Sequence, residues 1–298
     1  MMQDLTELIQ MAKSRPQRRV AVASADDEQV LKALKGAMNE GIISPVLIGN
    51  REKIEKVAVT VDFNLEGVDV INTEDSVDTA RVAVELVKNG DAEVLMKGRV
   101  STSQLLKAVL DKEIGLRTNM LLSHMALFHS PYYHKVFGVT DVAMNIAPSL
   151  EDKVQILKNA ISVYHKLGLE NPKVAVAAAV EVVNPKMEAT LHAFSLKEMN
   201  QKGEIDGCII DGPFAVDIAF NKDAALHKGI EGSVAGDCDI ILAPDIEAGN
   251  MFYKALNFLG GAHSAAVIMG AAAPIVLTSR SDDDQSKLLS IALAACIG

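Results

Sequence analysis

Two basic residues and two hydroxyls come together in Lys97–Thr102 (KGRVST), which joins an apolar run to a helical pattern. Backbone N–H groups at the start of a helix attract anions, and the lysine and the arginine add positive charge. The segment therefore suits a phosphate or carboxylate group. It also suits a plain helix start, in which Ser101 and Thr102 cap the helix and the bases are solvated. The spacing of these residues does not distinguish an anion-binding site from a simple helix start.

Ser279 and Arg280 follow the last apolar run of the chain and precede another helical pattern. An arginine holds a phosphate or carboxylate through two parallel N–H groups, and a neighbouring serine adds one donor. For Arg280 we favour the role of holding an anion, because a single arginine directly after a buried strand is not explained by contact with solvent alone. For Asp282–Asp284 the favoured role is that of first-turn acids that meet the helix dipole, with Ser279 or Ser281 as the N-cap.

The segment Pro244–Asn250 also follows a buried apolar run and carries Asp245, a second carboxylate, Gly249 and Asn250. Paired carboxylates can bind a metal, act as acid and base, or hold a ribose or an amide by hydrogen bonds. An acid-rich helix start is an equally weighted alternative. The tripeptide Asp211–Pro213 indicates a tight turn, with its aspartate as a candidate ligand contact.

Several motifs with established chemistry are absent. The sequence has no GxxxxGK[ST] phosphate loop, no GxGxxG after the first strand and no GxSxG elbow. His124, His129 and His134 are spaced five apart, which suits no zinc motif, so we interpret them as surface or hydrogen-bonded core residues. A covalent serine or cysteine hydrolase is therefore unsupported.

Strands and helices must hold these segments in place. Short runs rich in Val, Ile and Ala alternate with helical patterns along nearly the whole chain, which is typical of parallel sheets covered by helices on both faces. We therefore predict an α/β fold. The predicted strands are 19–24, 45–49, 93–96, 136–139, 173–180, 207–211, 239–243 and 274–277. The predicted helices are 26–39, 73–89, 103–111, 150–167, 185–200, 246–259 and 283–295.

Composition limits the classes of protein. Apolar residues make up 49% and charged residues 23% of the 298 residues, so a sizeable core is expected. The net charge of −10, the absence of Trp and the 4% of aromatic residues argue against a nucleic-acid partner. Acidic residues precede any apolar run, and no clean apolar segment reaches the roughly 20 residues of a membrane-spanning helix. Three scattered cysteines without CxxC spacing indicate buried thiols in a reducing, cytoplasmic protein (Cys208, Cys238 and Cys296).

The length suggests two domains at roughly 150 residues each. The boundary is expected near Ala147-Pro148, where a proline ends a polar turn before a long helical pattern. A single cut at that point is the simple interpretation. A C-terminal strand and helix that return to the first domain are the alternative, and periodicity does not separate the two.

Taken together, these segments resemble the phosphate acetyl/butyryltransferase family. The resemblance covers nearly the whole chain in one order and is closer to the butyryl branch, which takes short and branched acyl chains, than to the acetyl branch. Several long motifs in one order are more specific than any one of them. They are residues 96–118, 141–156, 173–190, 236–256 and 275–294.

The resemblance implies the reaction acyl-CoA plus phosphate giving acyl phosphate plus CoA, as in short-chain fatty acid metabolism. Coenzyme A would be a substrate, with no permanently bound cofactor and no metal. Two α/β domains of isocitrate/isopropylmalate dehydrogenase-like architecture, a cleft between them that holds the active site, and a homodimer or larger assembly are also implied. The family's first domain takes back the C-terminal strand and helix, which favours domains 1–147 plus 265–298 and 148–264.

By the same resemblance, Ser279 and Arg280 match the family's Ser-Arg pair at the acyl-phosphate site. Arg280 would hold the phosphate, and Ser279 would donate to it or to the carbonyl oxygen. The acetyl branch places its thiol-activating aspartate six residues after that arginine, where this chain has Ser286. Asp282 is the nearest substitute, matches the Ser-Arg-x-Asp pattern of the butyryl branch and is assigned the base role. The residues assigned to substrate binding or to shaping the cleft are Lys97, Gly98, Thr102, Asp211, Asp245, Gly249 and Asn250.

Two other functions compete with this assignment. A metal- and NAD-dependent decarboxylating dehydrogenase of related architecture would use Asp282–Asp284 as Mg²⁺ ligands but would leave Ser279-Arg280 without a special role. A sensor that binds acyl-CoA or acyl phosphate without turnover is favoured only by Ser286. The sequence does not determine the preferred acyl chain, the size of the oligomer or any regulation.

Overall fold

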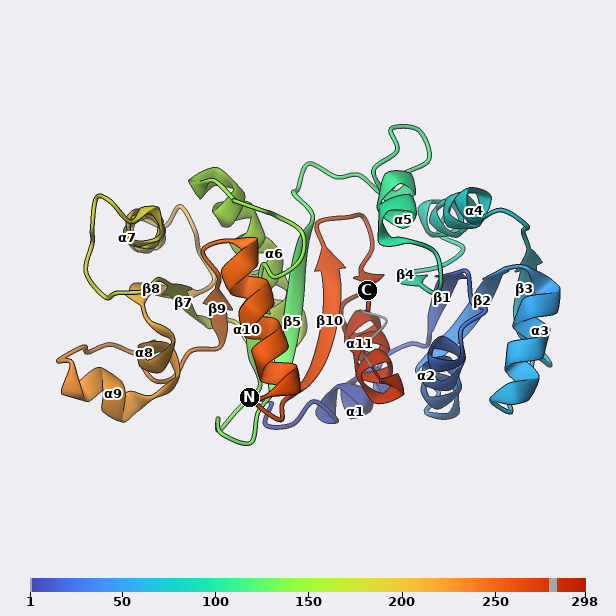
Figure 1. The fold of residues 1–298 in the computed structure, drawn as a ribbon, viewed down its shortest axis with the longest axis horizontal. Helices are drawn as coiled ribbons and strands as arrows, with labels where there is room; N and C mark the ends of the chain where they lie inside the picture. The colour runs from blue at the N-terminus through green and yellow to red at the C-terminus, as the bar shows by residue number, and fades with distance from the viewer. Residues whose placement is uncertain (1, 279–282) are drawn as a thin grey trace. The chain divides into compact units, whose positions relative to one another are not determined.

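The computed structural model describes residues 2–278 and 283–298, which form two compact units (Figure 1). Unit 1 contains the residues up to Asp4 and Leu121–His263, and unit 2 contains Leu5–Met120 and Ser264–Gly298. The predicted α/β fold is confirmed, because strands and helices alternate and most strand pairs are parallel. Compact grouping is not a test of independent folding, so the domains expected from the sequence stay a prediction.

Unit 2 is built on the strand order β3-β2-β1-β4-β11-β10, in which only β10 is antiparallel to its neighbour β11. Helices α4 and α5 lie on one face of this sheet, and α2 and α11 lie on the other (Figure 1). Its strands are β1 (Arg18–Ala23), β2 (Ile43–Gly49), β3 (Asp69–Asn72), β4 (Val94–Lys97), β10 (His263–Met269) and β11 (Ile275–Val276). Its helices are α1 (Glu7–Lys13), α2 (Glu28–Asn39), α3 (Arg51–Thr60), α4 (Ser76–Lys88), α5 (Thr102–Val109) and α11 (Asp284–Ile297).

Burial on both faces explains why the strands of unit 2 are continuous apolar runs. Val20–Ala23 of β1 have no exposed surface, so every position in this stretch must be apolar. Helix α2 follows the rule for a half-buried helix, since its buried residues recur at helical spacing and include Leu31 and Leu34. Burying each such side chain stabilises the fold by about 1.5–3 kcal/mol. Asp27 fixes the start of α2, because its side chain accepts a hydrogen bond from the Val30 amide at 3.0 Å.

Unit 1 has the strand order β5-β6-β9-β7-β8, in which β6, β9, β7 and β8 are parallel and β5 is antiparallel to β6. Its strands are β5 (Ser123–His129), β6 (Phe137–Thr140), β7 (Lys173–Ala177), β8 (Ile209–Phe214) and β9 (Ile240–Leu242). Its helices are α6 (Leu150–Lys166), α7 (Glu188–Gln201), α8 (Val216–Phe220), α9 (Lys222–His227) and α10 (Ile246–Phe258).

Helices also cover both faces of the sheet in unit 1. A side chain at Gly138 would meet Tyr164 of α6, so this position of β6 faces α6. Because successive residues of a strand face opposite sides, Val139 points to the other face, where it lines a hollow together with Phe252 of α10. Helix α7 packs against α6, and Phe220 of α8 packs against Phe252. Thus α6 and α7 cover one face, while α8 and α10 cover the other.

Three expectations from the sequence are wrong in detail. Asp211–Pro213 is not a tight turn but part of β8, which runs on to Phe214. The predicted strand 173–180 ends at Ala177. The N-cap of α11 is neither Ser279 nor Ser281 but Asp283, whose side chain accepts a hydrogen bond from the Ser286 amide at 2.7 Å. For Asp211–Pro213, pairing of β8 with β7 outweighs the local preference for a turn.

Several elements were not predicted at all: α1, α3, α8, α9, β3, β5 and β10. Most are short or carry polar residues on exposed positions, which weakens their periodicity. All three cysteines are buried and free, as the sequence indicated. Along the described part of the chain, no helix combines the length and apolar character needed to cross a membrane.

Candidate functional site

The carboxyl edge of the sheet in unit 2 brings two of the sequence segments together. Strands β1 and β4 are neighbours, but the chain leaves β1 toward α2 on one face and β4 toward α5 on the other (Figure 1). Ligands of α/β sheets bind at such a reversal of the connections. The Gly98 amide donates to the Ala23 carbonyl and the Arg99 amide to the Ser24 carbonyl, each at 2.8 Å. The loop after β4 is therefore fixed to the end of β1.

Gly98 is required for this close approach. A β-carbon at Gly98 would lie 2.0 Å from the Ser24 carbonyl oxygen, which no side chain allows. The glycine thus serves the packing of two backbone segments, and the position of the following loop depends on it.

Two buried lysines meet beside this loop. Lys97 is 7% exposed and Lys287, from α11, is 4% exposed, and both line a hollow of about 40 Å³ with Gly98 and Thr278. The Lys97 ammonium donates to the carbonyls of Gly98 at 3.1 Å and Val100 at 3.3 Å. The hollow, which Asp27 also lines, is a candidate site for an anion, because ammonium groups form strong charge-assisted hydrogen bonds to phosphate and carboxylate oxygens.

Thr278 connects this hollow to the Ser-Arg segment, which follows it directly along the chain. Its buried side chain lines the hollow, and the next residues along the chain are Ser279, Arg280 and Asp282, which lie outside the described residues. Sequence reasoning missed Lys287. The signal for it was a lysine directly before the nearly continuous apolar run 288–297 of α11.

The two hydroxyl residues of Lys97–Thr102 lie at the start of helix α5. Ser101 is the N-cap of α5 and forms a capping box with Gln104, so the capping interpretation holds for this serine. Thr102 is exposed at the first position of α5. A second hollow of about 400 Å³ includes Ser101 and Arg99, and Arg99 pairs with Asp26 at 3.5 Å.

In unit 1, the loop after β6 is a rigid element built on Asp141. This buried carboxylate accepts hydrogen bonds from the amides of Ala143 at 2.9 Å and Met144 at 3.0 Å and from the Asn145 side chain at 2.5 Å. Next to it lies His124, which is 6% exposed and whose Nδ1 has no hydrogen-bond partner among the described residues. Burial lowers the pKa of His124, and the nearby Asp141 opposes that shift.

One residue of the Pro244–Asn250 segment caps α10, and two others hold this helix against the loop at Asp141. Asp245 caps α10 by accepting from the Ala248 amide at 2.8 Å. A β-carbon at Gly249 would lie 2.4 Å from the Asp141 carbonyl oxygen, and the Asn250 side chain donates to the Val142 carbonyl at 3.1 Å. These contacts favour a positioning role for the segment over a pair of catalytic carboxylates.

Asp211 stands apart from these groups in the structure. It lies inside β8, the last strand of the sheet order in unit 1, and pairs with Lys197 of α7 at 2.6 Å. The contact connects a helix to the strand beneath it. The Asp211 side chain also accepts a hydrogen bond from the Gly212 amide at 2.8 Å.

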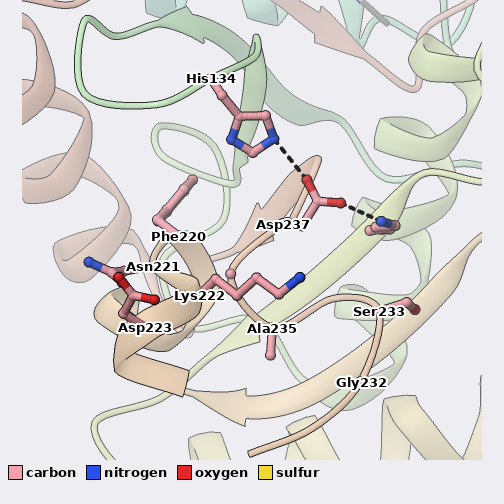
Figure 2. A pocket seen from close by; sticks show the side chains of 11 residues that line it. His134, Phe220, Asn221, Lys222, Asp223, Gly232, Ser233, Ala235 and Asp237 are labelled. Carbon is pink, nitrogen blue, oxygen red and sulfur yellow. Dashed lines mark hydrogen bonds and ion pairs between the residues drawn. The ribbon is translucent and has the colours of Figure 1, made fainter. Parts of the chain in front are cut away.

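The opposite, amino edge of the sheet in unit 1 carries a hollow of about 580 Å³ with His134 and Asp237 in its wall (Figure 2). The Asp237 carboxylate contacts His134 Nε2 at 3.0 Å, Lys135 Nζ at 2.9 Å and Lys173 Nζ. Burial raises the pKa of Asp237, but hydrogen bonds and charge from Lys173 and Lys135 outweigh it and lower the pKa to about 2. The charges compensate one another, so we interpret this cluster as structural. No group of three or more potential metal ligands is arranged for an ion within the described ranges.

Comparison with known proteins gives a consistent result. The model of the family described as phosphate acetyl/butaryl transferase matches residues 4–81 and 75–295. The phosphate butyryltransferase of Clostridium acetobutylicum is 43% identical over 297 residues, covering 100% of this chain and 99% of that protein. The phosphate acetyltransferase of Thermotoga maritima is 42% identical over 291 residues, with 98% of each chain covered.

Solved structures agree with these sequence relatives. A branched-chain phosphotransacylase from Enterococcus faecalis V583 has a TM-score of 0.84 at 33% identity and covers 94% of this chain and 99% of its own. A 4-hydroxythreonine-4-phosphate dehydrogenase from Burkholderia phymatum has a TM-score of 0.57 at 15% identity, covering 95% and 99%. At that identity the likeness to the dehydrogenase concerns the fold alone.

Proposed function

This chain belongs to the phosphate acetyl/butyryltransferase family, and from that membership we propose how its residues carry out the reaction. It is a phosphate acyltransferase, which moves a short-chain acyl group reversibly between coenzyme A and inorganic phosphate. Coenzyme A is therefore a substrate. The metal- and NAD-dependent dehydrogenase is not favoured, because the likeness to a solved dehydrogenase concerns the fold alone.

The chemistry needs no covalent enzyme intermediate. In the direction of acyl-CoA synthesis, the thiolate sulfur of CoA attacks the carbonyl carbon of the acyl phosphate, and the carbonyl oxygen takes up the negative charge. The bond from carbon to the phosphate oxygen then breaks, and inorganic phosphate leaves with the electron pair. The protein must hold two anionic substrates, accept the thiol proton and stabilise the charge that develops.

The observation that carries our proposal is the pair of buried ammonium groups, Lys97 and Lys287, directly beside Thr278. We assign the phosphoryl group of the acyl phosphate to this hollow. Arg280 would complete its neutralisation, and Ser279 would donate to the phosphate or to the carbonyl oxygen. Asp282 would take the thiol proton.

The remaining residues act on the shape of the site. Gly98 lets the loop after β4 approach the end of β1, and Thr102 begins the helix that continues that loop. Gly249 and Asn250 hold the loop at Asp141, and Asp245 holds the start of α10. For Asp211, the ion pair with Lys197 supports an indirect role through α7.

Phosphate-dependent release of free CoA thiol from acetyl-, butyryl- and isobutyryl-CoA, with and without a chelator, tests the function. We expect release that requires phosphate and is indifferent to the chelator. If pure, folded protein releases no thiol from any of the thioesters, the transferase is excluded and the non-catalytic sensor becomes the better proposal.

Lys287→Met is expected to lower kcat/KM for phosphate by about 10- to 100-fold, because a hydrogen bond to a charged group contributes about 1.5–3 kcal/mol. The measurement is initial-rate kinetics with phosphate varied at saturating acyl-CoA. Lys32→Met, which removes an exposed lysine of α2, is the matched control and should behave as the parent. An unchanged KM and kcat in a folded Lys287 variant would remove this lysine from the phosphate site.

Asp282→Asn is expected to slow acyl-CoA formation by about 10²-fold or more at neutral pH, since it removes a general base. A free thiol has a pKa near 8.5, so raising the pH supplies thiolate without the base and should restore part of the rate. Rates from pH 6 to about 9 measure this, with Asp284→Asn as the control in the first turn of α11. A pH profile identical to that of the parent would leave Asp282 without a role in thiol activation.

We also propose that the protein is a homodimer or a larger homo-oligomer. Helix α10 and its C-cap carry exposed apolar side chains, with Met251 73%, Phe258 63% and Leu259 88% exposed, and such surfaces are typical of contacts between chains. Light scattering on a sizing column should give at least twice the chain mass of 31.8 kDa, and Phe258→Glu should lower it. A parent protein of single-chain mass at micromolar concentration would contradict the proposal.

A location in the cytoplasm stays a prediction. It is supported by three cysteines that are all buried and free, as expected of a protein in a reducing compartment. The absence of a permanently bound cofactor also stays a prediction.

A further inference from the structure

The hollow at the amino edge of the sheet in unit 1 has a wall that the Asp237 cluster explains only in part (Figure 2). Besides that cluster, two segments of the chain line its volume of about 580 Å³. Residues 220–223 join α8 to α9, and residues 232–236 belong to the loop between α9 and β9. All of these residues lie in unit 1. We call this the amino-edge hollow.

The loop in its wall has backbone N–H groups without partners. The amides of residues 231–235 donate no hydrogen bond to any residue that the structure describes. Gly232 and Ser233 are exposed to solvent, whereas Val234 and Ala235 are 1% and 6% exposed. Backbone N–H groups of buried residues are almost always paired. The amide of Ala235, which lines the hollow, therefore needs an acceptor that the described chain does not supply.

Gly236 packs this loop against the start of α9. A β-carbon at Gly236 would lie 2.4 Å from the Cα of Lys222, and its φ of 76° is in the left-handed region that favours glycine. The close approach puts the first residue of α9 beside the unpaired amides. Successive backbone N–H groups in a turn form a concave site for an anion.

Lys222 adds a positive charge to this site. Its ammonium group has no hydrogen bond or ion pair with the described residues, and Figure 2 shows its side chain extended among the residues that line the hollow. The Asp237 carboxylate does not neutralise it, because two lysines and His134 already contact that group. Asp223, the other acid of the wall, is exposed, so solvent screens its charge.

These donors favour a phosphoryl group. Its oxygens point to the corners of a tetrahedron, so one can accept from a backbone amide while another meets an ammonium group, and such charge-assisted hydrogen bonds are strong. The Ser233 hydroxyl lines the hollow as a further donor. Sites for small ligands have volumes of about 300–1,000 Å³, so the hollow has room for more than the phosphoryl group.

We propose that the amino-edge hollow is a second anion site, which binds a phosphorylated small molecule through its phosphoryl group. The donors are the Lys222 ammonium, the Ser233 hydroxyl and the Ala235 amide. This inference goes beyond the proposed function and does not depend on it, because the hollow assigned to the reacting phosphate is lined by residues of unit 2 alone.

Equilibrium dialysis with radiolabelled inorganic phosphate at low ionic strength tests the site. We expect two phosphate ions per chain in the parent protein. Lys222→Met should weaken one of the two by about 10-fold or more, because it removes a hydrogen bond from a charged group, and Ser233→Ala should weaken the same one by less. Lys202→Met is the matched control, since Lys202 is an exposed lysine at the C-cap of α7 that does not line the hollow.

The same variants separate this site from the reaction. Lys222→Met should leave kcat and the KM for phosphate within twofold of the parent, whereas Arg280→Ala should weaken the other phosphate. Phosphate binding by folded Lys222→Met that equals the parent's would overturn the proposal, and so would a KM for phosphate that rises with the loss of binding. Displacement of the phosphate by succinate as readily as by pyrophosphate would overturn the choice of a phosphoryl group. An Arg280→Ala variant that still binds two phosphates would count against the proposed function alone.

Discussion

Arg280→Ala is expected to lower kcat/KM for phosphate and acyl-CoA by about 10²- to 10³-fold. Removing one preorganised donor at a developing negative charge typically has an effect of this size. The guanidinium adds to it, since its two parallel N–H groups match a phosphate and its charge is permanent. Arg280 is outside the described residues, but Thr278 two positions earlier lines the hollow with the buried Lys97 and Lys287.

Steady-state kinetics with each substrate varied in turn measure the effect of Arg280→Ala. Arg81→Ala is the matched control, because Arg81 is an exposed arginine of α4 that pairs with Glu85 at 3.1 Å. Arg280→Lys keeps the charge without the paired geometry and should fall between the parent and the alanine variant. Full activity of folded Arg280→Ala would remove this arginine from the mechanism.

The largest effect on stability is expected at Lys135, whose ammonium is the partner of a deeply buried carboxylate. Lys135 is 1% exposed and pairs with Asp239, which is 2% exposed, at 2.7 Å. Replacing one partner of a buried pair leaves an uncompensated charge and costs about 3–5 kcal/mol. Lys135→Met should lower the free energy of unfolding by that amount, as measured by urea denaturation near neutral pH.

Lys173→Met is the comparison variant for Lys135→Met. Lys173 also pairs with Asp237, but its side chain is 26% exposed, so solvent screens the lost contact and the loss should be smaller. A loss below about 1 kcal/mol for Lys135→Met, on the scale of an exposed ion pair, would show that the carboxylates do not depend on this lysine.

Acidification should weaken the same cluster. The pKa of Asp237 is about 2 in the folded protein, below the ordinary value of 3.8 that applies in the unfolded chain. The unfolded chain therefore binds the proton first, and the stabilisation that is present above pH 3.8 is lost as the pH falls toward 2. Urea midpoints of the parent should fall across this window, and those of Asp237→Asn should fall less. Equal slopes for the two proteins would contradict the shift.

The periodicity of the sequence predicts the parts of the fold that depend on local burial. Val20–Ala23 of β1 must be apolar at every position because helices cover both faces, and that pattern is visible without coordinates. Helix α2 is marked by its apolar stripe, whereas its cap at Asp27 is seen in the structure. By contrast, Asp211–Pro213 has the composition of a turn and is part of a strand, because pairing with β7 outweighs local preference there.

By itself, the sequence determined the α/β fold, the family and its reaction, since these follow from local patterns and from long motifs in one order. Only the tertiary structure decided that Lys287 lies with Lys97 at one hollow, that Gly249 fits against Asp141, and that Lys135 neutralises Asp239. These partners are far apart along the chain. Residue type and spacing report what a segment buries or exposes, but which distant segment it meets is fixed by strand order and helix packing.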